Sequence, residues 1–145
     1  MFFNSDFPAA DINRSKMLLK NYFNKKAAEF GLSAPHVPYV VLISKSQKSI
    51  TQQEASKILG YDKANSSRVV AELEAKGIIE KVAEDKRAVI KLTKQGEEVA
   101  VKVREAVKNW NELCFDGIDK QDMEAFNRVQ KRMFENCMKA IEENL

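Results

Sequence analysis

The sequence has 145 residues, of which 44% are hydrophobic and 31% charged, and its formal net charge is +3 at pH 7. This composition supports a packed core and a solvated surface, and it excludes an intrinsically disordered chain. No apolar run approaches the roughly 20 residues that span a membrane, and residues 1–11 lack the features of a signal peptide. Two cysteines are too few for a disulfide framework. We therefore expect a one-domain cytoplasmic protein with no membrane partner.

The charges are unevenly distributed along the chain. Residues 44–96 contain eleven Lys and Arg against seven Asp and Glu, a net charge of +4. Residues 97–145 contain eight against eleven, a net charge of −3. A basic segment is suited to contact with a phosphate backbone, although a difference of a few charges also arises by chance.

The first third of the chain predicts two helices. Residues 11–30 have apolar side chains at helical spacing, and Gly31 follows as a stop signal. Residues 32–38 include two prolines, which the first turn of a helix tolerates. Residues 39–43, Tyr-Val-Val-Leu-Ile, are apolar on all sides and fit a buried helix, with a buried strand as the alternative. A polar loop is expected at residues 44–49.

Two short helices joined by a glycine-containing turn are predicted next. Thr51 and Glu54 have the spacing of a capping box, and Gly60 suits the left-handed end of the helix that this box opens. Asp62 is expected to cap the second helix, which ends at Gly77. The inward-facing residues are expected to be Ala55, Ile58 and Leu59 on the first helix and Val69, Val70 and Leu73 on the second.

A basic β-hairpin and two long helices complete the pattern. Residues 78–82 and 88–92 have the composition of strands, and the polar residues 83–87 between them are the expected turn. Two helices followed by such a hairpin make a winged helix-turn-helix, whose second helix is the right size for a DNA major groove. Amphipathic helices are expected at residues 93–115 and after Asp119. Cys114 and Cys137 lie on their apolar stripes, where buried free cysteines usually act as small hydrophobic residues.

Three segments of this region carry a family resemblance. Residues 62–77 read Asp-Lys-Ala-Asn-Ser-Ser-Arg-Val-Val-Ala-Glu-Leu-Glu-Ala-Lys-Gly, residues 85–87 read Asp-Lys-Arg, and residues 92–96 read Leu-Thr-Lys-Gln-Gly. They resemble the recognition helix, the wing signature and the start of the next helix in the MarR family of winged-helix regulators. The flanking helices agree in order and length, so the resemblance covers nearly the whole chain.

The resemblance implies a fold and a function. The fold is mainly α with a small β-hairpin wing: a single chain of residues 1–145, with a winged helix-turn-helix DNA-binding lobe at 33–96 and dimerisation helices at 1–30 and 97–145. The family forms homodimers that bind pseudo-palindromic operators in double-stranded DNA, and many members release DNA on binding a small aromatic or amphipathic effector. The implied protein is a ligand-responsive repressor, not an enzyme, and it needs no cofactor.

The chain departs from the family pattern in three places, and two of them, Glu72 and the short wing, favour an alternative function. Ser66 stands where the family usually has an apolar residue, and Glu72 occupies an outward position that is often basic. Between Gly77 and Asp85 the wing is about two residues shorter than is usual in the family, and it lacks a proline at its tip. Because a carboxylate at position 72 would repel phosphate, the alternative is a winged-helix protein–protein interaction module that has lost DNA binding.

The expected DNA contacts come from both short helices and the hairpin. Asn65 is suited to an adenine edge and Arg68 to a guanine edge, although Asn65 and Ser67 are alternatively local caps of the backbone. Arg87 is the candidate for the minor groove, with Asp85 bracing its guanidinium by an ion pair. The full set of expected DNA-contacting residues is Thr51, Gln52, Lys63, Ala64, Asn65, Ser67, Arg68, Asp85, Lys86 and Arg87.

An effector site is expected in the crevice between the long helices and the DNA-binding lobe. Its expected walls are Tyr22, His36, Tyr39 and Trp110. His36 is the sole histidine, so a histidine triad has one candidate base and a zinc site would need distant ligands. The sequence contains no glycine-rich phosphate loop or nucleophile motif, and neither catalytic residues nor a metal site are predicted.

Overall fold

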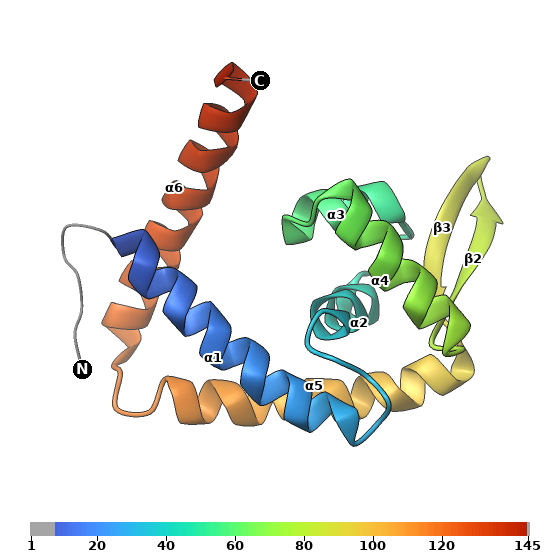
Figure 1. Cartoon of the computed structure of the whole chain (residues 1–145), viewed down its shortest axis with the longest axis horizontal. Coiled ribbons are helices and arrows are strands. Elements are labelled where there is room, and N and C mark those ends of the chain that lie inside the picture. Colours follow the sequence, from blue (N-terminus) through green and yellow to red (C-terminus); the bar gives the residue numbers. More distant parts are fainter. Residues whose placement is uncertain (1–7, 145) are drawn as a thin grey trace. The chain divides into compact units, whose positions relative to one another are not determined.

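The computed structural model describes residues 8–144, which form helices and a small antiparallel sheet (Figure 1). The helices are α1 (Pro8–Ala28), α2 (His36–Lys45), α3 (Gln52–Leu59), α4 (Lys63–Ala75), α5 (Lys94–Cys114) and α6 (Lys120–Asn144). The strands are β1 (Ile50–Thr51), β2 (Ile79–Glu84) and β3 (Arg87–Leu92), in the sheet order β1-β3-β2. The chain divides into two compact units, Met1–Lys108 and Asn109–Leu145. The mainly α fold class is confirmed.

Residues 39–43 are helical, so the strand alternative for this run is wrong. They belong to α2, whose Tyr39 and Val40 have no exposed surface and lie in the core. Pro38 lies in the first turn of the helix, where its missing N–H leaves no intrahelical bond unmade. Because a helix satisfies its own backbone, this apolar run is buried without a partner strand.

The boundaries of α3 and α4 follow local hydrogen bonds, as predicted. The backbone N–H of Glu54 donates to the Thr51 hydroxyl (3.2 Å), and the Glu54 carboxylate accepts from the Thr51 N–H (2.8 Å). Gly60 ends α3 with a φ of 71°, and Asp62 caps α4 by accepting from the Asn65 N–H at 2.8 Å. Ile58, expected on the buried face of α3, is 58% exposed because the short helix buries only one narrow face. The fully buried side chains of α4 are Val69, Val70 and Leu73.

The hairpin turn is shorter than predicted. Ala83 pairs with Ala88 and Glu84 with Arg87, so the strands extend to a turn made of Asp85 and Lys86 alone. Both turn residues have positive φ, 49° and 61°, which matches the twist of a two-residue hairpin. β1 was not expected from the sequence, and it pairs with β3 at the edge of the sheet.

The Leu-Thr-Lys-Gln-Gly run joins the wing to α5. The Thr93 hydroxyl donates to the Gly77 carbonyl oxygen (2.5 Å) and accepts from the Gly96 N–H (2.9 Å). A Cβ atom at Gly96 would lie 1.9 Å from the Ile78 carbonyl oxygen. Glycine is therefore required at position 96 for α5 to begin this close to the strand that follows α4.

The second unit contains α6, a helix with no buried residue between Lys120 and Asn144. The Asp119 carboxylate caps it by accepting from the Asp122 N–H at 2.9 Å, as predicted. Cys114 and Cys137 are exposed, which corrects the expectation of buried thiols: an apolar stripe is buried only where another element covers it. The exposed large apolar side chains of α6 are Phe126, Val129, Met133, Phe134 and Ile141. Among the described helices, none is long and apolar enough to cross a membrane.

Candidate nucleic-acid interface

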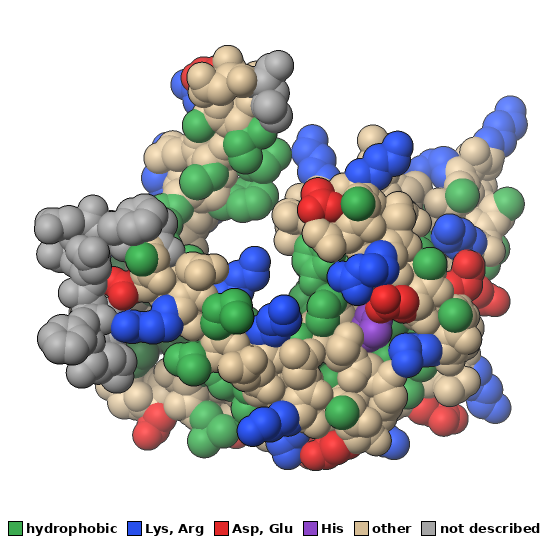
Figure 2. Space-filling model, viewed as in Figure 1, with side chains coloured by type: hydrophobic (Ala, Val, Ile, Leu, Met, Phe, Trp, Pro, Cys, Tyr) green, Lys and Arg blue, Asp and Glu red, His purple; other side chains and the backbone are tan. Residues whose placement is uncertain are grey.

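The first two turns of α4 present a polar face to solvent. Ser66 and Val69 point into the core, whereas the neighbouring side chains are exposed. Lys and Arg side chains gather on the side of the lobe that carries α3, α4 and the hairpin (Figure 2). An exposed helix start beside a hairpin is the geometry with which a winged helix enters a groove. The exposed residues of these two turns are Lys63, Ala64, Asn65, Ser67 and Arg68, all of them among the expected contacts.

A hollow between α3 and α4 brings three of the expected DNA-contacting residues together. Gln52, Lys63 and Ser67 line a cavity of about 470 Å³, and the Gln52 amide donates to the Ser67 hydroxyl at 3.3 Å. The Ser67 hydroxyl is thus engaged across the two helices rather than as a backbone cap. Amide, ammonium and hydroxyl groups at the start of a helix are donors suited to a phosphate oxygen.

Asn65 is held at the start of α4. Its side-chain amide donates to the Asp62 carboxylate at 2.6 Å, and its backbone N–H donates to the same carboxylate. These two hydrogen bonds lower the pKa of Asp62 below its usual value. The Asn65 side-chain oxygen lies 3.5 Å from the Arg68 guanidinium. The Asn65 side chain therefore contacts two neighbouring side chains, and the residue that caps the backbone here is Asp62 rather than Asn65.

Arg68 belongs to a row of polar side chains that leads into the lobe. Its guanidinium donates to one oxygen of Glu72 at 3.2 Å, and the ring N–H of His36 donates to the other oxygen at 2.7 Å. His36 is 2% exposed, and burial lowers its pKa although Glu72 opposes the shift. The hydrogen bond from His36 is also the main reason that the pKa of Glu72 is lowered.

The wing is tied to α3 by Arg87. The Arg87 guanidinium donates to the Glu54 carboxylate at 2.5 Å, so the ion pair expected between Arg87 and Asp85 is replaced by one with Glu54. Asp85 occupies the turn with a positive φ, whereas Arg87, at the start of β3, pairs with Glu54 of α3. The pKa of Glu54 is lowered first by its hydrogen bond from the Thr51 N–H and further by Arg87. Asp85, Lys86 and Arg87 are all exposed.

The four residues expected to wall an effector site differ in the contacts that they make. Tyr39 is fully buried, with its hydroxyl 2.5 Å from that of Ser66, and His36 is buried against Glu72. Tyr22 packs edge-on against Phe23 on α1, and Trp110 lies in the second unit.

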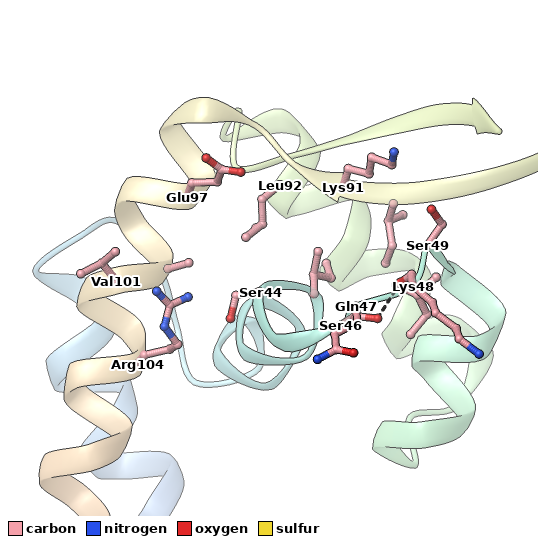
Figure 3. Close-up of a pocket in the computed structure, with 14 residues that line it drawn as sticks. Ser44, Ser46, Gln47, Lys48, Ser49, Lys91, Leu92, Glu97, Val101 and Arg104 are labelled. Carbon is pink, nitrogen blue, oxygen red and sulfur yellow. Dashed lines mark hydrogen bonds between the residues drawn. The ribbon is translucent and has the colours of Figure 1, made fainter.

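Two cavities of the first unit lie where the long helices meet the lobe, and none of these four residues lines either of them. One, of about 570 Å³, lies between α5, the end of α2 and β3, and Figure 3 shows Arg104 pointing from α5 toward Ser44. The other, of about 210 Å³, is almost entirely apolar and lies between α1 and α2. Sequence reasoning missed its lining, although Lys16, Leu19, Lys20 and Phe23 recur on one face of α1 at helical spacing. The α1 cavity is lined by Lys16, Leu19, Lys20, Phe23, Ala34, Pro35, Val37, Pro38 and Tyr61.

Comparison with known proteins relates the lobe to a family. Residues 30–88 match the model of the MarR family. This segment is similar to the domain that defines the MarR family. The resemblance stated from the sequence is therefore confirmed, and the MarR family consists of transcriptional regulators rather than enzymes. No curated protein sequence matches the chain.

Solved MarR-family structures share the fold over most of their length. A MarR transcriptional regulator from Methanosarcina mazei Go1 is 21% identical, with a TM-score of 0.80 over 94% of this chain and 99% of that one. A MarR-family regulator from Listeria monocytogenes, complexed with 26mer DNA, is 22% identical, with a TM-score of 0.82 over 94% and 89%. CouR from Rhodococcus jostii RHA1, bound to p-coumaroyl-CoA, is 18% identical, with a TM-score of 0.73 over 84% and 87%.

Proposed function

We propose that the protein is a cytoplasmic, homodimeric, sequence-specific DNA-binding repressor whose affinity for its operator responds to a small ligand. The observation that carries the proposal is the exposed polar face at the start of α4, beside the basic hairpin of a MarR-family domain. The similar Listeria protein is complexed with DNA, which supports DNA as the partner of this fold.

The exposed residues divide into two roles on DNA. Arg68 and Asn65 read base edges in the major groove, while Lys63, Gln52 and Ser67 hold a phosphate at the hollow between the helices. Lys86 and Arg87 extend the contact along the wing toward the minor groove. The carboxylate of Glu72 does not oppose this assignment, because it is engaged by Arg68 and His36.

The uncovered apolar side chains of α6 support a homodimer. An exposed apolar stripe of this size marks an interaction surface. A second copy of the chain supplies the same stripe, which is the geometry of a two-fold interface. The two recognition helices of the dimer then lie about 34–36 Å apart, and the operator is a pseudo-palindrome.

The apolar cavity beside α1 supports a small-molecule effector. Its walls are suited to an aromatic ring, and Lys16 and Lys20 at its lining are suited to a carboxylate or phosphate on the same molecule. The similar CouR protein is bound to p-coumaroyl-CoA, a molecule with both features. An effector that binds one arrangement of α1 and the lobe more tightly shifts the dimer toward it and lowers its DNA affinity.

Binding selection with a randomised double-stranded DNA library tests the function. Wild-type protein is expected to select a pseudo-palindrome whose affinity falls steeply with salt. Arg68→Ala is expected to weaken binding to that sequence by about 10- to 100-fold and to relax the preference at one position in each half-site. Lys76→Ala removes the same charge from the far end of α4 and is expected to keep the preference.

Two results would overturn the assignment. Normal binding and preference by Arg68→Ala would remove Arg68 from base reading. The absence of any salt-dependent DNA affinity in a folded wild-type protein would favour the protein–protein interaction module instead.

A further inference from the structure

We propose that Glu72 is a positioning residue that is anchored by His36, orients Arg68, and thereby sets the base preference of the protein. This inference rests on the proposed function, because it assigns a determinant of sequence preference on the same DNA-binding face. Its basis is a continuous row of hydrogen bonds from the buried start of α2 to the exposed face of α4.

His36 is fixed at both ring nitrogens. The Ser33 backbone N–H donates to Nδ1 at 3.0 Å, so Nδ1 is the acceptor and Nε2 carries the hydrogen. Nε2 then donates to the Glu72 carboxylate at 2.7 Å. Because the side chain of His36 is only 3% exposed, packing holds the ring in this orientation. The position of the Glu72 carboxylate is thus fixed by a hydrogen bond from a buried side chain.

Glu72 divides its two oxygens between the core and the DNA face. Oε2 accepts from His36, and Oε1 accepts from Nη1 of Arg68 at 3.2 Å. An ordinary surface pair between residues four apart on a helix orders an arginine only weakly, since both side chains move. Here one partner is anchored by a buried ring, so the planar guanidinium is held in a restricted orientation.

The remaining donors of Arg68 stay available for a base. Nη1 is engaged by Glu72, and Nη2 lies 3.5 Å from the Asn65 oxygen, a weak contact. Arg68 is 53% exposed, and a guanidinium has five N–H groups, enough to contact Glu72 and a guanine edge together. Because Glu72 orients the Arg68 guanidinium before DNA binds, Arg68 loses less rotamer freedom on binding. The fixed orientation also favours the base edge whose acceptors match the guanidinium N–H groups.

A glutamine at position 72 separates this role from a general effect of charge. Its amide keeps an oxygen at one of the two carboxylate oxygen positions and places an NH2 donor at the other. Because His36 and Arg68 each donate to a different oxygen of Glu72, one of these two hydrogen bonds is lost in the same geometry. Glu74 offers the matched control, because it is exposed on the same helix and Glu74→Gln removes the same charge. Both variants should therefore change non-specific DNA affinity to a similar extent.

The experiment measures base preference with the full chain and the randomised DNA library. Glu72→Gln is expected to lower the discrimination for guanine at the Arg68-dependent position by about tenfold, whereas Glu74→Gln leaves it unchanged. In an Arg68→Ala background, Glu72→Gln is expected to cause no further loss. His36→Gln keeps an N–H donor and should retain more discrimination than His36→Phe; thermal melting establishes that each variant folds.

The outcomes distinguish the two proposals. A wild-type base profile in Glu72→Gln, together with a relaxed profile in Arg68→Ala, would overturn the positioning role and leave the DNA-binding function intact. A uniform loss of affinity in Glu72→Gln, with the preference unchanged, would also overturn it. If the wild-type protein selects no sequence at all, both the function and the positioning role fail.

Discussion

Ser66 and Glu72, two of the departures from the family pattern, have partners inside the lobe. The Ser66 hydroxyl lies 2.5 Å from that of Tyr39, so a polar pair occupies a place in the core where an apolar side chain is usual in the family. Glu72 is engaged by His36 and Arg68. A buried hydroxyl is tolerated in a core when it is hydrogen-bonded, and Glu72, whose side chain is 39% exposed, has both oxygens engaged, so both departures have a structural explanation.

His36 predicts a pH-dependent stability. Its pKa in the unfolded chain is near 6.5, and burial lowers the pKa in the folded lobe; Glu72 opposes this shift, while Lys76 and Arg68 reinforce it. As the pH falls below 6.5, the unfolded chain binds more protons than the folded one, and the free energy of unfolding decreases toward the lowered pKa. This loss precedes the one expected from Glu72, whose pKa lies below 4.5.

Urea unfolding at about pH 7.5 and about pH 5.5 measures this effect. Wild-type protein should be less stable at the lower pH, and His36→Gln should show a smaller decrease, since the chain has no other histidine. Equal decreases in the two proteins would contradict the prediction.

At the scale of elements, α6 shows how an amphipathic pattern depends on a partner. Its side chains have the three-and-four spacing of a buried stripe, yet none of the residues from Lys120 to Asn144 is buried. The cap at Asp119 explains where α6 begins, but it does not indicate which surface packs against the apolar stripe. A second copy of the chain is the partner that the proposed function requires.

A charge on this stripe should break the dimer. Phe134 is 49% exposed, and Phe134→Glu places a carboxylate where two copies would bury it, which we expect to weaken dimerisation about 100-fold or more. Light scattering after gel filtration should give wild-type protein a mass of twice 16.5 kDa and the variant a mass near 16.5 kDa. Arg128→Gln changes the net charge by the same amount on the opposite face and should remain dimeric. A dimeric Phe134→Glu would exclude this stripe as the interface.

For the molecule as a whole, the cavity beside α1 lies where the proposed effector would contact both α1 and the segment that precedes the proposed DNA-binding helix. Its walls come from α1, the start of α2 and Tyr61, which immediately precedes the cap of the recognition helix. The Tyr61 hydroxyl also donates to the Pro35 carbonyl oxygen at 3.0 Å. A ligand in this cavity therefore contacts both a proposed dimerisation helix and the residue next to α4.

Filling the cavity with a larger side chain should reduce the effect of the ligand on DNA affinity. p-Coumarate, an aromatic carboxylate, is expected to weaken binding to the selected DNA sequence, as measured by fluorescence anisotropy of labelled DNA. Leu19→Trp occupies the cavity and should reduce the response about tenfold or more, whereas Leu18→Trp, at an exposed neighbour on α1, should keep it. An equal response in both variants would place the ligand elsewhere. No response to p-coumarate or to related aromatic carboxylates in the wild type would contradict an effector of this class.

Elements whose causes are local could be predicted from the order of the residues. The capping box of Thr51 and Glu54, the cap at Asp62 and the stop at Gly60 were all predictable, because each depends on residues within a few positions of one another. The fold class and the exposed start of α4 follow from the same kind of pattern. The tight turn at Asp85 and Lys86 was missed, because neither residue is the glycine that usually marks positive φ.

The pairing of side chains from different elements depends on tertiary packing. Arg87 pairs with Glu54 rather than with the nearby Asp85, and His36 reaches Glu72 across 36 positions. Residue type indicates that such groups need partners, but not which ones they find. That choice depends on how α2, α3, α4 and the hairpin pack, because packing brings together groups that are far apart in the chain and separates groups that are adjacent in it.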